Sequence, residues 1–133
     1  MRMALFLAPL LLVGCAGGSE PPRLTERQIA RLESALAGKV AGEPVSCISR
    51  YPQSNLTAIS DGVLLYRVNS RLIYRNDLIG RCSGLTRGDT LVVTSHGSQY
   101  CRGDMAKSAD LTIGMITGAC ALGSFTPYRT PGR

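Results

Sequence analysis

The chain has 133 residues, of which 15 are basic and 9 acidic, giving a net charge of +6, and it contains five cysteines and no tryptophan. This length is enough for one domain of common size. The basic residues are scattered singly, without lysine–arginine blocks or interleaved aromatic residues, which argues against nucleic-acid binding.

The N-terminal segment has the layout of a secretory signal. Arg2 precedes an apolar run from Ala4 to Val13. That length fits a signal peptide, whose apolar region spans about 7–15 residues, and is shorter than the roughly 20 residues of a transmembrane helix. The run ends in Leu12-Val13-Gly14-Cys15, which resembles the lipobox of bacterial lipoproteins. The resemblance implies cleavage after Gly14 and attachment of acyl chains such as palmitate through the Cys15 thiol. An ordinary signal peptide and an uncleaved anchor are the alternatives.

We therefore divide the chain into a signal peptide (1–14), a lipidated cysteine with a flexible tether (15–23) and one domain (24–133). Cleavage removes only Arg2 among the charged residues, so 14 basic and 9 acidic residues remain and the net charge becomes +5. Ala16 follows the cysteine, and the resemblance to Gram-negative lipoproteins then implies sorting to the outer membrane. The expected location is the cell envelope, facing the periplasm.

One helix is predicted directly after the tether. Thr25 can cap it, and Gln28 stands three residues later as the partner in a capping box. Gly38 is placed to end the helix. The apolar stripe of this helix comprises Ile29, Leu32, Ala35 and Leu36.

From Cys47 onward the pattern predicts short strands. Asp61-Gly62 and Asn69-Ser70 predict turns between them. We expect Ser98 to Cys101 to return from a turn at His96-Gly97 and pair with the strand before it. The segments with strand character are 56–60, 63–68, 72–74, 90–95, 98–101 and 119–128.

Two stretches near the C-terminus are less regular. Gly123 interrupts the last strand segment and predicts a bulge or bend. The stretch 107–118 is compatible with a short helix or with strands, since it contains several β-branched residues. The elements together predict a mainly β (α+β) domain, a small curled antiparallel sheet or barrel with one N-terminal helix and two disulfides.

The remaining cysteines, Cys47, Cys82, Cys101 and Cys120, form an even set in an exported chain, which predicts two disulfides. Their spacings do not match zinc motifs, so we expect no metal. Three pairings are open. We favour Cys82–Cys101 with Cys47–Cys120, because the segment between Cys82 and Cys101 can fold back through a strand and a turn.

Few residues suggest catalysis. His96 is the only histidine, and a catalytic triad would need Ser95, Ser98 or a distant serine together with Asp89 or Asp104. No nucleophile-elbow motif surrounds any serine. Asp89 and Asp104 could act as a glycosidase pair at about 5–10 Å from each other, but each follows a glycine, which is typical of a structural turn. We therefore predict no catalytic residue and no cofactor.

The tripeptide Arg102-Gly103-Asp104 matches an integrin-binding motif. Three residues are a weak motif, and their position beside Cys101 favours a structural turn.

The segment 47–128 resembles an uncharacterised family of small exported proteobacterial proteins with a four-cysteine framework. The residues that carry the resemblance are Cys47-Ile48, Cys82 with Gly84-Leu85, Cys101 with Gly103-Asp104, and Cys120 with Leu122-Gly123 and Phe125. The resemblance implies two disulfides and an envelope location, and it assigns no functional residue.

These observations favour a non-catalytic binding or structural module in the periplasm, held on the membrane by its lipid. An envelope protein or an anionic glycan is the expected partner, the latter because of the positive charge. One alternative is a hydrolase of envelope polysaccharide or peptidoglycan that uses Asp89 or Asp104. Another is a small hydrolase inhibitor, whose usual cationic targets match a net charge of +5 poorly.

Overall fold

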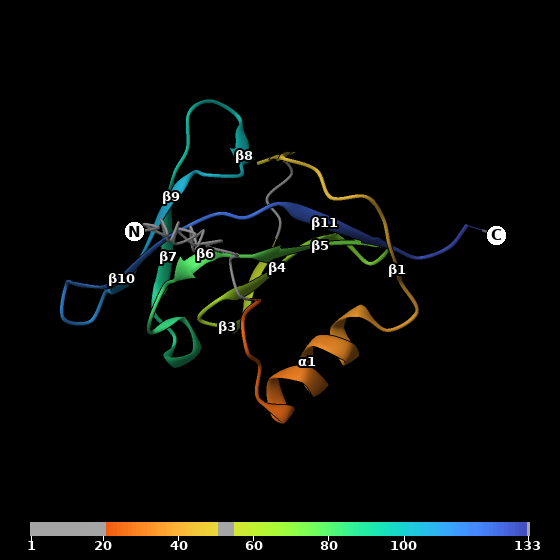
Figure 1. The fold of residues 1–133 in the computed structure, drawn as a ribbon. Coiled ribbons are helices and arrows are strands. Elements are labelled where there is room, and N and C mark those ends of the chain that lie inside the picture. The colour runs from red at the N-terminus through yellow and green to blue at the C-terminus, as the bar shows by residue number, and fades with distance from the viewer. Residues whose placement is uncertain (1–20, 51–54, 133) are drawn as a thin grey trace, which may run out of the picture.

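The computed structural model describes residues 21–50 and 55–132, so the predicted signal peptide and Cys15 lie outside the described residues. Figure 1 shows the arrangement of the elements. In chain order they are α1 (Glu26–Leu36), β1 (Val40–Ala41), β2 (Cys47–Ser49), β3 (Asn55–Ser60), β4 (Val63–Asn69), β5 (Leu72–Asp77), β6 (Ile79–Arg81), the 3-10 helix η1 (Leu85–Arg87), β7 (Thr90–Thr94), β8 (Gln99–Cys101), β9 (Met105–Asp110), β10 (Met115–Ala121) and β11 (Phe125–Arg129).

The described strands form three antiparallel sheets. A five-stranded sheet has the order β1-β11-β5-β4-β3, a four-stranded sheet has the order β6-β10-β9-β7, and β2 pairs with β8. The predicted mainly β fold with one helix and two disulfides is confirmed. The barrel alternative is wrong, because both larger sheets keep two unpaired edges.

The helix α1 covers one face of the five-stranded sheet, below it in Figure 1. It begins as predicted, with a capping box in which the Thr25 hydroxyl accepts from the Gln28 backbone N–H at 3.3 Å and the Gln28 side chain accepts from the Thr25 N–H at 3.0 Å. Gly38 follows the helix with φ +71°, a conformation that favours glycine. The core on this side comprises Leu32, Ile59, Val63, Leu65 and Ile73.

The opposite face of the five-stranded sheet forms a second core with the other two sheets. Strand β4 contributes to both cores, which explains its unbroken apolar run from Val63 to Tyr66. Burial raises the pKa of the Tyr66 phenol well above its ordinary value. The second core comprises Ile48, Leu64, Tyr66, Leu78, Cys82, Leu85, Ala106, Cys120, Leu122 and Phe125.

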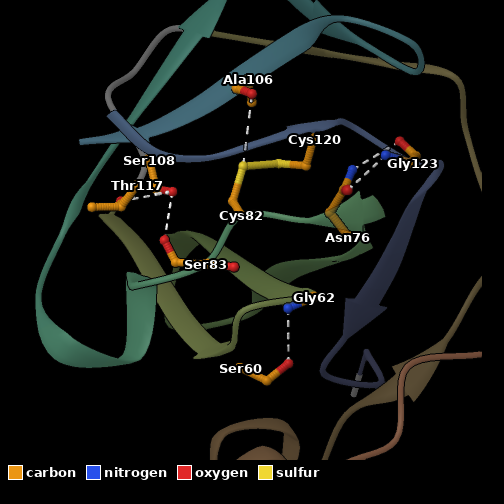
Figure 2. The surroundings of a disulfide bond; sticks show 10 residues. All are labelled: Ser60, Gly62, Asn76, Cys82, Ser83, Ala106, Ser108, Thr117, Cys120 and Gly123. Carbon is orange, nitrogen blue, oxygen red and sulfur yellow. Dashed lines mark hydrogen bonds between the residues drawn. A yellow bond between two sulfur atoms is a disulfide. The ribbon is translucent and has the colours of Figure 1, made fainter. Parts of the chain in front are cut away.

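The chain passes twice between the two larger sheets. β5 leads into β6 through Leu78, and β10 leads into β11 through residues 122–124. At the second crossing the Asn76 amide donates to the Gly123 carbonyl at 2.8 Å and accepts from the Gly123 N–H at 2.9 Å (Figure 2). A Cβ on Gly123 would overlap the Asp77 carbonyl. The bend predicted at Gly123 is confirmed, and only glycine allows the two backbones to approach this closely.

Strand pairing differs from the prediction around β8. This strand pairs with β2, whereas β7 pairs with β9. The loop 95–98 carries the chain away from the four-stranded sheet, so the return strand that we expected beside β7 does not form there. The ambiguous stretch 107–118 lies in β9, the turn 111–114 and β10, and is not helical.

The same difference changes the disulfides. The β2–β8 register places Cys47 directly opposite Cys101, and these two residues are bonded. The other disulfide joins Cys82, just after β6, to Cys120 in β10 (Figure 2). All four cysteines are therefore paired as predicted, but the favoured pairing of Cys82–Cys101 with Cys47–Cys120 is wrong.

We expect the Cys82–Cys120 disulfide to contribute more stability than Cys47–Cys101. Loss of a disulfide in a small exported domain costs about 2–5 kcal/mol, and the difference between the two loop lengths is worth only about 0.3 kcal/mol. Cys82 and Cys120 are also buried in the core, so their replacement removes packed sulfur atoms as well. The Cys82→Ala/Cys120→Ala variant should therefore lose more free energy of unfolding in urea than Cys47→Ala/Cys101→Ala, and equal or reversed losses would contradict this.

Candidate functional site

The structure does not assemble the catalytic arrangements that the sequence suggested. His96 is exposed in the loop 95–98, and in the described part of the chain it has no hydrogen bond to Asp89, Asp104, Ser95 or Ser98. The Ser95 hydroxyl instead accepts from the Arg50 guanidinium at 3.2 Å. That guanidinium also lies over the Tyr100 ring, so this loop is held by structural contacts.

The two candidate carboxylates lie at opposite ends of the β7–β9 pair. Asp89 precedes the first residue of β7 and Asp104 precedes the first residue of β9, and these strands are antiparallel. The register separates them by about six residues along the strands, or about 20 Å. This is well beyond the spacing of a glycosidase pair.

Asp104 has a structural role in a turn. Its carboxylate accepts from the Cys101 N–H at 2.9 Å, and Gly103 between them has φ +91°. The Arg102-Gly103-Asp104 tripeptide is therefore part of the turn that follows β8, as the prediction of a structural turn requires.

Asp89 joins a polar chain at one end of the four-stranded sheet. Its carboxylate is only 8% exposed and accepts from the Thr117 hydroxyl at 2.6 Å. The same hydroxyl lies 3.2 Å from the Ser108 hydroxyl, which donates to the Ser83 carbonyl at 2.6 Å (Figure 2). A Cβ on Gly84 would overlap the Asp89 carboxylate. Asp89 thus connects the segment after β6 to β9 and β10.

The described residues hold no group of three or more potential metal ligands. Within the same residues, none of the helices has the length and apolar character needed to cross a bilayer.

The most unusual surface lies on the four-stranded sheet and its β9–β10 hairpin. Seven of the eleven exposed large hydrophobic residues in the described chain belong to it, so exposed apolar area is concentrated in one part of the molecule. We call these seven residues the apolar surface. They are Ile79, Val92, Met105, Leu111, Ile113, Met115 and Ile116.

The strand register places three residues of the apolar surface, Ile79, Val92 and Met105, at outward positions of the sheet, and the other four lie in or beside the turn of the β9–β10 hairpin. Side chains alternate between the two faces of a strand. Since Ala106 and Ser108 of β9 are buried, the alternating residues Met105 and Lys107 point outward. Residues paired across antiparallel strands share a face, so two cross-strand rows point outward together. The first row is Ile79, Ala121, Met105 and Thr94, and the second is Arg81, Ala119, Lys107 and Val92.

These outward rows carry two exposed cations, Arg81 and Lys107, and no carboxylate. An antiparallel sheet with one face in water normally alternates apolar residues inside with polar residues outside. Here Ile79, Val92 and Met105 occupy outward positions instead. Large exposed apolar patches are typical of contacts with proteins or membranes, which makes this part of the sheet the candidate site.

The apolar surface is not among the predictions from the sequence. The segment Leu111–Ile116 falls in the stretch 107–118, which is compatible with helix or strand, and hydrophobic residues in such a segment are expected inside a core. A usable signal was Gly114 with Asp110 four residues earlier, since both residue types favour turns and hydrophobic residues within a turn lie at the surface.

The described chain enters the domain beside the apolar surface. Pro22 packs on Gly62, where an added Cβ would lie 3.2 Å from the proline Cβ. Pro21 and Pro22 also line a surface pocket together with Ile79, Gly80 and Arg81 of β6. The predicted tether from Cys15 therefore leads to the β6 edge of the four-stranded sheet.

Comparison with known proteins yields no match to a family model, to a curated protein or to a solved structure.

We expect Asp89 to be needed for folding. Asp89→Ala removes the acceptor of the Thr117 hydroxyl in a nearly buried site, which should lower the free energy of unfolding by about 1–3 kcal/mol. His96→Ala, at an exposed loop position, should change it by no more than about 0.5 kcal/mol. Chemical denaturation of both variants measures this, and an unchanged stability of Asp89→Ala would contradict a structural role.

Proposed function

We propose that this protein is a non-catalytic lipoprotein of the bacterial cell envelope. In this proposal Cys15 carries acyl chains in the outer membrane, and the domain faces the periplasm. The apolar surface is its contact with another component of the envelope.

The observation that carries this proposal is the concentration of exposed apolar residues on one sheet. Leu111 and Ile113 are 71% and 64% exposed, and together with Met115 and Ile116 they occupy one hairpin. Leaving such residues in water is unfavourable, at about 25 cal/mol for each Å² of apolar area that a partner could bury. A binding module therefore accounts for a feature that an isolated structural domain does not need.

The arrangement of the polar residues supports a non-catalytic role. The carboxylates of Asp89 and Asp104 are engaged in structural hydrogen bonds and lie far apart. The resemblance to the four-cysteine exported family supports the envelope location.

The lipid anchor has a direct test in Cys15→Ser. This change removes the sulfur to which a diacylglyceryl group would attach, so the protein should leave the membrane fraction or remain unprocessed. Ser19→Ala, in the same tether, should leave fractionation unchanged. Mass spectrometry of the wild-type N-terminus should detect the acyl chains. Unchanged membrane association of Cys15→Ser would contradict the anchor.

The apolar surface has its own test by photo-crosslinking in living cells. A photoreactive amino acid at Ile113 should form an adduct with an envelope component, because this side chain lies at the exposed end of the hairpin. The matched control is Val40, which is 62% exposed but belongs to β1 at the other end of the molecule (Figure 1). His96→Ala should not alter the adduct. No adduct from Ile113, or equal adducts from both positions, would contradict the proposed binding surface.

A further inference from the structure

We propose that the apolar surface docks on the bilayer to which Cys15 anchors the chain, with anionic phospholipid headgroups facing Arg81 and Lys107. This inference rests on the proposed lipid anchor and names the bilayer as the contacted component. The domain would then lie against the membrane through the four-stranded sheet and the β9–β10 hairpin.

The position of the tether favours this orientation. Cys15 is six residues before Pro21, and an extended chain covers at most about 20 Å over that distance. Pro21 and Pro22 line one surface pocket together with residues of β6, which is one edge of the four-stranded sheet. The acyl chains of the proposed anchor would then enter the bilayer within about 20 Å of this edge. The part of the domain that faces the membrane should therefore include residues near β6.

The charges around the apolar surface suit an anionic bilayer. Ile79 and Arg81 come from β6 itself, and Met105 and Lys107 lie two strands away in the same outward rows. Membrane-surface segments typically combine apolar residues, which enter the headgroup region, with Lys and Arg, which meet the phosphates. The outward rows contain no carboxylate that would oppose anionic headgroups, and the one carboxylate of the hairpin, Asp110, accepts from the Thr112 N–H.

Strand pairing closes the base of the hairpin, and one backbone N–H of its turn is bonded to a side chain. β9 and β10 pair through Asp110 and Met115, and the Thr112 N–H donates to the Asp110 carboxylate at 2.8 Å. Leu111 and Ile113 are then free to contribute apolar side chains at the end of the hairpin. Backbone groups that are already paired lower the cost of moving a turn out of water.

Tryptophan fluorescence tests the docked orientation, since the native chain contains no tryptophan. The full-length acylated protein with Ile113→Trp is reconstituted into vesicles of phosphatidylcholine and phosphatidylglycerol with brominated acyl chains. Contact with the bilayer should shift the emission to shorter wavelength and quench it at least about twofold more than in the matched Val40→Trp protein. The two positions have nearly equal exposure in the domain, 64% and 62%, so a difference reports on the membrane and not on the fold.

A charge-reversal pair tests the contribution of the headgroups. Arg81→Glu/Lys107→Glu in the Ile113→Trp protein should reduce the quenching in vesicles with phosphatidylglycerol. Arg27→Glu/Arg31→Glu, which alters two exposed arginines of α1, should not. Equal effects of the two pairs would overturn the assignment of anionic headgroups to Arg81 and Lys107.

The outcomes separate this inference from the function on which it rests. If mass spectrometry finds Cys15 without acyl chains, both the lipoprotein function and the docking are overturned. If Cys15 is acylated and Ile113→Trp is unquenched in pure lipid vesicles, only the docking is overturned. An Ile113 adduct with an envelope protein, together with unquenched fluorescence, would instead assign the apolar surface to that protein.

Discussion

The fold depends on the close approach of two backbones where the chain crosses between its sheets. Gly123 lies against the Asp77 carbonyl, and the Asn76 side chain satisfies both backbone groups of Gly123. This contact lets β10 continue into β11 while β5 continues into β6. The stretch β5–β6 therefore pairs with the stretch β10–β11 in both sheets, as β5 with β11 in one and β6 with β10 in the other. The second core lies between these sheets, and the Cys82–Cys120 disulfide connects β10 to the residue after β6. A larger residue than glycine at position 123 would therefore disturb both sheets at once.

Local features of this fold were predictable because they depend on neighbouring residues. The capping box at Thr25 and Gln28 is one example, since its hydrogen bonds close within three residues. The turn at Asp61-Gly62 is another. The pairing of β8 was not predictable in this way. Its partner β2 lies about fifty residues earlier, and nothing near residue 99 distinguishes that partner from the adjacent strand β7. The disulfide error followed directly, because the favoured pairing assumed a local hairpin.

The candidate site shows a related limit. A hydrophobic residue in a strand predicts burial on average, but the sequence does not state which sheet face will be covered. Leu91 and Val93 of β7 face the core, whereas Val92 between them is exposed. All three have the same apolar character. Only the three-dimensional arrangement shows that none of the described segments packs on the outer face of the four-stranded sheet.

The placement of the single helix explains why that face is open. In the described chain α1 covers the outer face of the five-stranded sheet, and the four-stranded sheet covers its inner face. The remaining described segments are strands, turns and the 3-10 helix η1, and none of these described segments forms a further layer over the four-stranded sheet. A freely diffusing domain would be expected to place polar residues there, as antiparallel sheets with one solvated face do. A domain held permanently beside a bilayer is under a different constraint, because the membrane itself can act as the missing layer. Under the proposed membrane anchoring, the apolar outward rows, the cations among them and a tether that reaches the domain near β6 would all follow from one arrangement.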